Sequence, residues 1–381
     1  MKDIVSVVLI GSTPKPRTYK RIAVLQQISK VNLLCWDRMN DTRLKIDRDV
    51  DYPIYVHEIK AANDPLKRMG PYMQFTKKAL KQLEEIQPDL IHVEGLDMLR
   101  IADTYKRKSK KKVIVVYEVP DLRRLITEPQ KGLVKNAAKF YVTSLEKTLC
   151  NRADLIIMTS EMFYETHYKG MVDRSKFIYI PNVPEFKAFT DFHKYDGGEY
   201  AIGWIGGVRY KEQMKMMLKA SEQLGCKVLV AGYEKEPVEI EPICKEMPNV
   251  EWTGMYDYNR DVATLYGKCS VVYAVYDANM VNEQIALPNK LYEAVYCELP
   301  IIVSKGTYLA KVVEDWGVGL VVDCTNQEEI TVALKKLRDD KELYEGFVKQ
   351  CRAHRQDLNL EKYNEELKAA INRMFRLKKV Q

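Results

Sequence analysis

The sequence LPNKLYEAVYCELPIIV, residues 287–303, contains the pattern on which the fold prediction rests. Pro288 followed by Asn289 is a good helix start, because proline is preorganised for the first turn of a helix. Residues 300–303 then form a short apolar run that is typical of a buried strand. A helix that is followed directly by a buried strand is the repeating unit of parallel sheets covered by helices.

The same alternation of short apolar runs and longer amphipathic stretches continues in both directions along the chain. It indicates two doubly wound, Rossmann-like α/β domains that face a central cleft. The expected strands are residues 4–10, 31–36, 54–59, 90–93, 113–119, 155–159 and 177–180 in the first domain, and residues 200–205, 228–231, 250–253, 271–276, 300–303 and 319–322 in the second.

We predict the domain boundary near residue 190. Residues 184–198 lack clean periodicity and end on Gly197-Gly198, as expected of a linker. After residue 325 the chain is helical in pattern, and its last segment is expected to pack back on the first domain as a C-terminal helix. The predicted division is therefore residues 1–190, the first Rossmann-like domain; 191–360, the second; and 361–381, the returning helix.

Composition limits the class of protein. The chain has 381 residues, of which 46% are apolar and 30% charged, so wholesale disorder is excluded. A formal net charge of +7 is too small to indicate a dedicated nucleic-acid binder. The charge is uneven, because residues 1–185 contain 33 Lys and Arg against 23 Asp and Glu, and residues 186–381 contain 27 against 30. We therefore expect the first half to meet an anionic partner.

Eight cysteines are scattered singly, with no CxxC pair and no Cys/His cluster of zinc-ligand spacing. They are expected to be buried thiols in a reducing compartment, and no metal site is predicted. The apolar run at residues 4–10 is too short for a signal peptide or a membrane span, and no other run reaches about 18 residues. We expect a cytoplasmic protein whose membrane contact, if it has one, is peripheral on the inner face of the cell membrane.

Ligands of doubly wound domains bind at the carboxyl ends of the strands, so site residues should follow strands. At the helix start near residue 289, the backbone amides of Lys290, Leu291 and Tyr292 are expected to point outward, where the helix dipole favours a phosphate. Lys290 adds a full positive charge. Glu293 lies one turn later on nearly the same face, where its carboxylate can accept two ribose hydroxyl groups.

A second candidate segment is a glycine turn after the strand at residues 200–205. Gly206 and Gly207 allow close approach of a ligand to the backbone, and Arg209 and Lys211 can contact a diphosphate. Gly11 follows the first strand and is expected to face the same cleft. Each turn alone is more often only a tight turn, but three strand-end turns with a helix-start lysine and glutamate favour a nucleotide site.

Residues 286–293 (ALPNKLYE) and 298–304 (ELPIIVS) resemble the donor-site motif of the GT-B-fold glycosyltransferases of family four, the sugar-nucleotide enzymes of bacterial polysaccharide assembly. The resemblance extends over nearly the whole chain. Its further segments occur in the family's order: residues 88–92 (PDLIH), 117–121 (YEVPD), 153–156 (ADLI), 180–183 (IPNV), 206–207 (GG) and 252–254 (WTG).

The resemblance implies that residues 191–360 form the donor-binding domain and residues 1–190 the acceptor-binding domain. It further implies that Glu293 holds the donor ribose and that Arg209 and Lys211 hold the diphosphate. It also implies a retaining reaction without a metal, in which positive side chains stabilise the leaving diphosphate. No cofactor is expected beyond the nucleotide-sugar co-substrate, with UDP favoured over GDP. The helix start that would contact the distal phosphate comprises Asn289, Lys290 and Leu291.

Two positions depart from the family pattern. The family often has a second glutamate eight residues before the ribose-binding one, where this chain has Ile285. Either Glu283 or Asn282 substitutes for it, or the contact with the sugar is absent. Many members have a histidine after the fifth strand of the first domain, where this chain has Pro120.

The loss of that histidine leaves Asp121 and Glu118 as candidates to bind the acceptor hydroxyl or to deprotonate it. We favour Asp121, since a residue inside the strand, such as Glu118, can point into the sheet. His92, Glu94 and Asp97 are acceptor-site candidates because they lie at or just past the fourth strand. A structural role for His92 is an equally good hypothesis.

The resemblance implies a lipid-linked saccharide as acceptor, and its diphosphate and the anionic membrane around it would attract the two basic segments of the first half. Residues 106–112 contain six Lys and Arg and are expected to form an exposed connection between a helix and a strand. Residues 131–150 combine lysines with an apolar stripe, which we interpret as a face toward the core in preference to a face on a membrane.

The sequence thus predicts a glycosyltransferase that moves a hexose or N-acetylhexosamine from a nucleotide diphosphate to a saccharide acceptor, which we expect to be lipid-linked, in polysaccharide or glycoconjugate biosynthesis. Arg209 and Lys290 are predicted to act on the leaving diphosphate. Two alternatives stay open on the same fold. One is a non-catalytic adaptor or scaffold, which Ile285 and Pro120 favour; the other is a sugar-nucleotide epimerase.

Overall fold

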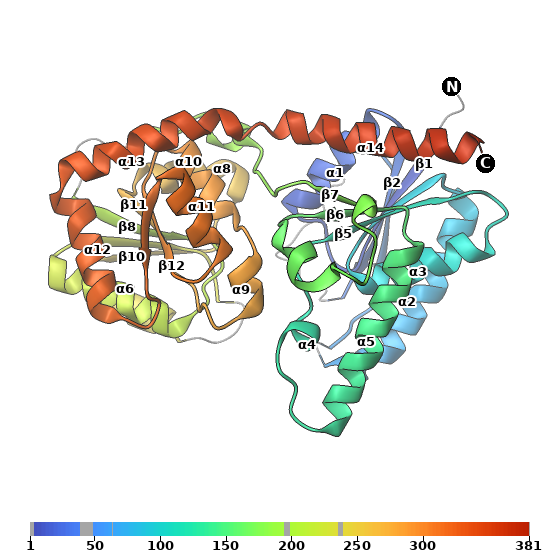
Figure 1. Ribbon diagram of the computed structural model, residues 1–381, viewed down its shortest axis with the longest axis horizontal. Helices are drawn as coiled ribbons and strands as arrows, with labels where there is room; N and C mark the ends of the chain where they lie inside the picture. Colours follow the sequence, from blue (N-terminus) through green and yellow to red (C-terminus); the bar gives the residue numbers. More distant parts are fainter. Residues whose placement is uncertain (1–3, 39–48, 63, 194–198, 235–238, 381) are drawn as a thin grey trace. The chain divides into compact units, whose positions relative to one another are not determined.

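The computed structural model describes residues 4–38, 49–62, 64–193, 199–234 and 239–380, and it divides the chain into two compact units (Figure 1). Unit 1 comprises Met1–Pro181 and Glu361–Gln381, and unit 2 comprises Asn182–Leu360. Each unit has its own parallel sheet with helices packed around it. The prediction of two doubly wound α/β domains is confirmed.

The sheet of unit 1 has seven strands in the order β3-β2-β1-β4-β5-β6-β7, and all neighbouring pairs are parallel. Its central strands are buried along almost their whole length because both faces are covered by helices. Every residue of β5, for example, is buried. The strands are β1 (Val5–Ile10), β2 (Lys30–Asp37), β3 (Ile54–Glu58), β4 (Leu90–Glu94), β5 (Ile114–Val119), β6 (Leu155–Met158) and β7 (Phe177–Tyr179).

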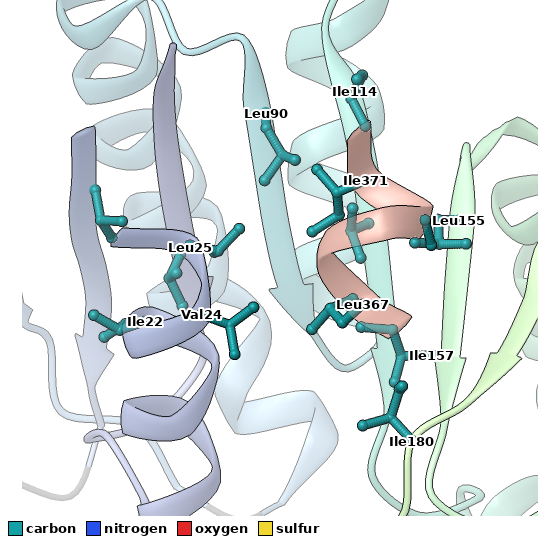
Figure 2. Close-up of a cluster of buried hydrophobic side chains, with 14 of the residues drawn as sticks. Ile22, Val24, Leu25, Leu90, Ile114, Leu155, Ile157, Ile180, Leu367 and Ile371 are labelled. Atoms are coloured by element: carbon teal, nitrogen blue, oxygen red, sulfur yellow. The ribbon is translucent and has the colours of Figure 1, made fainter. Parts of the chain in front are cut away.

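One face of this sheet is covered by α1 and by the C-terminal helix α14. Leu367 and Ile371 of α14 pack into one buried cluster with side chains of β4, β5 and β6, and Ile22 and Leu25 of α1 belong to the same cluster (Figure 2). The predicted return of the last helix to the first domain is therefore confirmed. The helices of unit 1 are α1 (Pro16–Gln26), α2 (Pro65–Ile86), α3 (Leu96–Lys108), α4 (Arg124–Thr127), α5 (Leu133–Arg152), η1 (Tyr164–Tyr168), η2 (Arg174–Lys176) and α14 (Leu360–Val380).

Unit 2 has a six-stranded parallel sheet in the order β10-β9-β8-β11-β12-β13. All thirteen predicted strands of the chain are present, with ends within about three residues of those expected. The strands of unit 2 are β8 (Ala201–Ile205), β9 (Lys227–Ala231), β10 (Val250–Gly254), β11 (Val271–Ala274), β12 (Ile301–Ser304) and β13 (Gly319–Val322).

The helices of unit 2 begin and end at residues with the expected capping chemistry. The Thr307 side chain accepts from the Ala310 amide at the start of α11, and Gly317 ends that helix in the left-handed conformation. Asn326 caps α12 in the same way. These helices are η3 (Phe186–Phe189), α6 (Lys211–Leu224), α7 (Glu241–Glu246), α8 (Tyr258–Gly267), α9 (Val281–Ile285), α10 (Asn289–Tyr296), α11 (Tyr308–Trp316), α12 (Gln327–Asp339), α13 (Lys341–His354) and η4 (Arg355–Asp357).

The chain passes from unit 1 to unit 2 after Pro181, earlier than the predicted boundary at residue 190. The cause is a pair of phenylalanines in the segment that was expected to be a linker. The Phe186 ring stacks on Tyr296 with centroids 3.9 Å apart, and the buried Phe189 lies 5.8 Å from Tyr266. These aromatic contacts join the segment to the core of unit 2. Residues 194–198, which include the Gly-Gly pair, lie outside the described residues.

The N-terminal half of α5 differs from its prediction. Leu133 and Tyr141 were expected to face the core, yet both are exposed, and the buried residues of this helix begin only at Glu146.

All eight cysteines of the chain lie in its described part, where they are buried and form no disulfide. Among the described residues, no helix has the length and apolar character needed to cross a bilayer.

Candidate active site

In both sheets the strand order reverses at one point, next to the first strand of the unit. In unit 1 the order reverses between β1 and β4, and in unit 2 it reverses between β8 and β11. At such a point the connections leave toward opposite faces of the sheet, and the carboxyl ends of the strands border a ligand-binding crevice. The predicted glycine turns follow β1 and β8, the first strand of each sheet.

In unit 2 the backbone at this edge is built from closely packed glycines. Gly206 has φ +126°, and its amide donates to the Ala231 carbonyl at 2.8 Å. Gly232 has φ +148°, and a β-carbon on it would lie 1.9 Å from the Gly206 carbonyl oxygen. The Gly232 amide in turn donates to the Gly254 carbonyl. Only glycine permits this approach, so the ends of β8, β9 and β10 form one continuous backbone rim.

Lys290 lies against this rim. It is the second residue of α10, only 7% of its surface is exposed, and its Cε lies 3.5 Å from the place of a β-carbon on Gly206. Its Nζ lies 3.7 Å from the ring centroid of Trp204 and 5.4 Å from that of Tyr276. The ammonium group is therefore held in an aromatic cage by cation–π contacts at the end of the sheet.

The charge state of Lys290 responds to its surroundings. Burial lowers the pKa of Lys290 to about 7, the Glu293 and Glu283 carboxylates act to raise it, and the Arg209 guanidinium acts to lower it. Four charged groups of the sequence thus act on one another at the start of α10. An anionic ligand here would favour the charged form of Lys290 over the neutral form.

The helix start itself differs slightly from its prediction. Pro288 is the N-cap of α10, so the backbone amides of Asn289, Lys290 and Leu291 do not donate to a carbonyl four residues earlier in the helix. This set of amides begins one residue earlier than expected. The Leu291 amide donates to the Pro288 carbonyl at 3.2 Å. The Asn289 side chain accepts a hydrogen bond of 2.6 Å from Asn182, which positions the first turn.

Glu293 is deeply buried, with 4% of its surface exposed. Tyr258 donates to one carboxylate oxygen at 2.7 Å and Tyr266 donates to the other at 2.6 Å. Both tyrosines belong to α8, so this helix fixes the orientation of the carboxylate. Burial, followed by the charge of Glu293, raises the pKa of Tyr258 well above its ordinary value, and both phenols therefore stay proton donors.

The two basic residues that follow the glycine turn have different surroundings. Arg209 is exposed, and its Nε lies 3.7 Å from the place of a β-carbon on Gly207. Lys211 begins α6 and its ammonium group is paired with Glu239. Of these two predicted diphosphate ligands, only Arg209 acts on the pKa of Lys290.

This chain has Ile285 at the position where the family often has a second glutamate, and Glu283 supplies a carboxylate two residues earlier. Ile285 is buried, whereas Glu283 accepts a hydrogen bond of 2.5 Å from the Tyr210 hydroxyl and acts on the pKa of Lys290. Tyr210 itself has φ +58°, an uncommon conformation for a non-glycine residue, and its ring lies 4.9 Å from that of Tyr276. Glu283 thus borders the cage of Lys290.

In unit 1 the predicted residues Gly11, Glu94, Asp97 and Asp121 all lie at the carboxyl-end edge of the sheet. Ile10 of β1 is in register with Glu94 of β4, so Gly11 follows directly beside Glu94. Glu94 accepts from Thr18 at 3.0 Å, and Asp97 pairs with Arg123 at 2.9 Å.

Asp121 follows β5 in an exposed turn at this edge. Gly11 packs against Met98, whose Cε lies 3.3 Å from the place of a β-carbon on the glycine.

Glu118 and His92 are in a different environment. Glu118 is completely buried, and Arg21 donates to both of its carboxylate oxygens at 3.0 Å. His92, also buried, lies 3.0 Å from the same carboxylate through its Nε2. Burial acts to raise the pKa of Glu118, but Arg21, His92 and Arg17 outweigh it and hold that pKa far below its ordinary value. The structure thus places both residues in a buried network with Arg21, away from the surface of unit 1.

The basic run at residues 106–112 comprises the last residues of α3 and the start of the connection to β5, and most of it is exposed; the prediction of a connection thus holds only from Ser109 onward. Lys106 pairs with Asp154 and Lys111 pairs with Asp89, each at 2.7 Å. Because this connection precedes β5, it lies at the edge of the sheet opposite to Glu94 and Asp121. The run is therefore not adjacent to the candidate acceptor residues.

Sequence reasoning missed the aromatic partners of the site. Trp204 and Tyr276 around Lys290, and Tyr258 and Tyr266 around Glu293, are spaced like ordinary core aromatics. The one available signal was composition, since the chain has 24 tyrosines against 9 phenylalanines. An excess of hydroxyl-bearing rings indicates aromatic residues that donate hydrogen bonds in the interior.

Two doubly wound sheets with a cationic helix start and a buried carboxylate at one switch point define the class of nucleotide-sugar transferases of the GT-B fold. Two family models match the chain, "Glycosyltransferase Family 4" over residues 31–183 and "Glycosyl transferases group 1" over residues 187–354. The chain belongs to the GT-B glycosyltransferases of family four.

Individual relatives agree with this assignment. The chain is 24% identical to the succinoglycan biosynthesis protein ExoL of Rhizobium meliloti (strain 1021) over 286 residues, 71% of this chain and 70% of that protein. The fold is similar to that of sucrose-phosphate synthase from Thermosynechococcus elongatus, with TM-score 0.75, 15% identity and coverage of 98% and 99%. It is also similar to Anabaena Alr3699/HepE in complex with UDP-glucose, with TM-score 0.71, 14% identity and coverage of 96% and 99%.

Proposed function

We propose that this glycosyltransferase moves a hexose or N-acetylhexosamine from a UDP-sugar to a lipid-linked saccharide acceptor in polysaccharide or glycoconjugate biosynthesis. The observation that carries the proposal is the position of Lys290, a buried ammonium group at the first turn of α10 against the Gly206 rim. A helix start, a lysine and a glycine rim together bind a phosphate through charge, dipole and backbone contact.

In this proposal unit 2 binds the donor. The first-turn amides of α10 and the Lys290 ammonium contact the distal phosphate, and Arg209 contacts the other phosphate through its planar guanidinium. Gly206 and Gly207 allow the diphosphate to approach the backbone. Lys211 contributes less than Arg209 because its ammonium is paired with Glu239.

Glu293 holds the donor ribose. Each oxygen of its carboxylate accepts a hydrogen bond from one tyrosine hydroxyl. A carboxylate oxygen can accept more than one hydrogen bond, so a ribose hydroxyl can bind beside the tyrosines. The tyrosines fix the direction of those lone pairs before the donor binds. Such preorganisation reduces the entropy lost on binding.

The reaction is proposed to retain anomeric configuration and to need no metal. Charge develops on the diphosphate as its bond to the sugar breaks, and Lys290 and Arg209 stabilise that charge where a metal ion acts in other transferases. Glu283 is proposed to contact the transferred sugar, in the role that the family assigns to the position of Ile285. Its hydrogen bond with Tyr210, whose ring lies beside Tyr276 of the Lys290 cage, supports this assignment.

Unit 1 is proposed to bind the acceptor at its carboxyl-end edge. Asp121 binds the acceptor hydroxyl or deprotonates it, and Glu94 and Asp97 contact the acceptor saccharide. Asp121 is preferred over Glu118 because it is exposed, whereas Glu118 is buried in the ion-pair network with Arg21.

The donor and the biological setting are proposed from relatives. ExoL is named for succinoglycan biosynthesis, which supports a polysaccharide product. HepE was solved in complex with UDP-glucose, which supports UDP and a hexose.

The test is calorimetric titration of the full chain with UDP, GDP and ADP, followed by measurement of donor hydrolysis and of transfer to saccharide acceptors. We expect UDP to bind tightest, and Arg209→Ala to weaken binding more than Lys211→Ala. Equal effects of the two substitutions would contradict the assigned diphosphate position. UDP binding without hydrolysis or transfer would favour the adaptor, and conversion of the free UDP-sugar into an isomer would favour the epimerase.

A further inference from the structure

Three arginines gather at the carboxyl-end edge of the sheet of unit 1, where the candidate acceptor residues also lie. Arg38 directly follows β2, Arg68 is the fourth residue of α2, and Arg123 lies in the turn between β5 and α4. In a parallel sheet the strands end at this edge, and the helices that follow them begin there. We call Arg38, Arg68 and Arg123 the arginine cluster. The fold thus brings three positive charges from distant parts of the sequence to one edge.

One carboxylate, that of Asp97 in the first turn of α3, is shared within the arginine cluster. Arg123 donates from its Nη2 to Asp97 at 2.9 Å. The same carboxylate acts to raise the pKa of Arg38, and among the described residues it is the one acid that does so. Asp64, near Arg68 in the sequence, accepts a backbone amide at the start of α2. The arginine cluster therefore carries more positive charge than Asp97 neutralises.

Two aromatic side chains fix the position of the cluster. The Cζ of Arg38 lies 5.8 Å from the ring centroid of Trp36, which is buried in β2. Tyr72 lies one turn after Arg68 on the same face of α2, and its ring lies 6.2 Å from that of Trp36. The Tyr72 hydroxyl donates to the backbone carbonyl of Asp97 at 3.0 Å. The end of β2 and the starts of α2 and α3, which pack on each other (Figure 1), are thus held together.

Arg38 lacks a partner that its burial requires. Its Nε is shielded from solvent and has no hydrogen-bond acceptor in the part of the chain that the structure describes. Buried donors of this kind are rare, and leaving one unsatisfied is costly. Burial lowers the pKa of Arg38, and the repulsion from Arg68 outweighs the attraction of Asp97. An oxyanion bound here would supply both the missing acceptor and the missing negative charge.

The chemistry of the cluster selects a carboxylate or a phosphate group. The planar guanidinium fork matches the paired oxygens of these groups, and hydrogen bonds between ionised partners are about twice as strong as neutral ones. A neutral sugar hydroxyl would leave the excess charge in place. The diphosphate of the donor has its own basic residues in unit 2, Lys290 and Arg209, so the arginine cluster of unit 1 is left for another anion.

We propose that the arginine cluster binds an anionic substituent, a carboxylate or a phosphate group, of the saccharide acceptor, and that it thereby selects acidic over neutral acceptors. Arg38 donates from its Nε to the anion, and Asp97 holds Arg123 in place for a second contact. Asp121 lies at the same edge, so the reacting hydroxyl and the acidic group of one acceptor would bind side by side. That the anion belongs to the acceptor rests on the proposed function, whereas oxyanion binding by the cluster does not.

The test is calorimetric titration of the full chain with glucuronate, glucose 6-phosphate and glucose, with and without saturating UDP to fill the donor site. We expect both acidic sugars to bind at least about tenfold more tightly than glucose, and the tighter of the two identifies the anion as carboxylate or phosphate. Arg38→Gln and Arg68→Gln should each weaken binding of the acidic sugars about tenfold or more. Arg38→Lys keeps the charge without the fork and should recover only part of the affinity.

The matched control is Arg107→Gln. Arg107 lies near the opposite end of α3, where its largely exposed side chain pairs with Asp103. The substitution removes the same charge from unit 1 and should leave the affinity for acidic sugars unchanged. Melting temperatures verify that all variants fold.

Transfer assays measure the selection directly. An acidic oligosaccharide and its carboxyl-reduced, neutral counterpart serve as acceptors. Arg38→Gln should raise KM for the acidic acceptor about tenfold, with little change for the neutral one and none in the Kd of UDP.

Three outcomes would overturn the proposal. These are affinities for the acidic sugars no higher than for glucose, unchanged affinities in the Arg38→Gln and Arg68→Gln variants, and an equal loss in Arg107→Gln. UDP titration of the same samples separates the two hypotheses. A chain that binds UDP and transfers sugar to a neutral acceptor without binding either acidic sugar contradicts only the arginine cluster. A chain that binds acidic sugars through Arg38 without transferring sugar contradicts only the proposed function.

Discussion

The Nζ atom of Lys290 lies 3.7 Å from the centroid of the Trp204 ring, and burial there lowers the pKa of Lys290 to about 7. A lysine that is partly neutral at neutral pH is poised to respond to a diphosphate. The ligand favours the ammonium form, so the pKa of Lys290 rises when the ligand binds.

The first prediction concerns the pH dependence of donor binding. Above about pH 7, UDP binding should take up a proton at Lys290, and its Kd should rise by up to about tenfold per pH unit until the pKa of the complex is reached. Calorimetry in buffers of different ionisation enthalpy measures the proton uptake. Lys290→Arg keeps the charge at every pH, so its Kd should lose this dependence. A pH-independent Kd for the unaltered chain would show that Lys290 does not contact the phosphate.

The second prediction concerns the tyrosines that hold Glu293. Glu293→Gln replaces one acceptor oxygen by an NH2 donor, so the hydroxyl of Tyr258 or Tyr266 loses its acceptor and the ribose loses a charged acceptor. Hydrogen bonds to charged groups contribute about 1.5–3 kcal/mol, so the Kd of UDP should rise by about 10- to 100-fold. Tyr258→Phe should have a smaller effect in the same direction.

The control for this pair is Glu222→Gln, an exposed glutamate on α6, which should bind UDP with unchanged affinity. If Glu293→Gln matched this control in calorimetry, the assignment of the ribose site would be wrong.

The third prediction concerns the glycine rim. Gly232→Ala should lower the free energy of unfolding by about 4 kcal/mol or more, because the new β-carbon would lie 1.9 Å from the Gly206 carbonyl oxygen. Gly225→Ala is the matched control, since it also has positive φ but no neighbour within 4 Å. It should cost only about 1–2 kcal/mol for the left-handed conformation. Urea unfolding measures both, and equal losses would contradict the close backbone approach.

The fourth prediction concerns the network of Arg21 and Glu118. Arg21→Met leaves a buried carboxylate without its main partner and should lower the free energy of unfolding by about 3–5 kcal/mol. Because the folded-state pKa of Glu118 lies below its ordinary value of 4.5, the ionised carboxylate stabilises the fold above that pH, and this stabilisation is lost as the pH falls.

The same network should therefore be visible in acid unfolding. The stability difference between the unaltered chain and Glu118→Gln should be largest near neutral pH and should shrink below about pH 4.5. A difference that stayed constant from neutral pH to acid would show that folding does not lower the pKa of Glu118.

The sequence by itself determined the elements and their chemistry where the signal is local. All thirteen strands, the glycine turn after β8 and the start of α10 at Asn289 follow from apolar runs, glycine and proline whose effects act over a few residues. For the same reason Lys290 and Glu293 were placed correctly on one helix, because the helical repeat alone puts them on one face.

Only the tertiary structure decided what surrounds these residues. Tyr258 precedes Glu293 by 35 positions and Arg21 precedes Glu118 by 97, so neither contact leaves a trace in local periodicity. The domain boundary lies earlier than residue 190 because Phe186 stacks on Tyr296 of unit 2. The N-terminal half of α5 is exposed, against its prediction, because an amphipathic pattern does not show which side of a helix contacts protein. The sequence determines the type of each side chain. Its burial, its charge state and its hydrogen-bond partners depend on which distant segments the fold brings together.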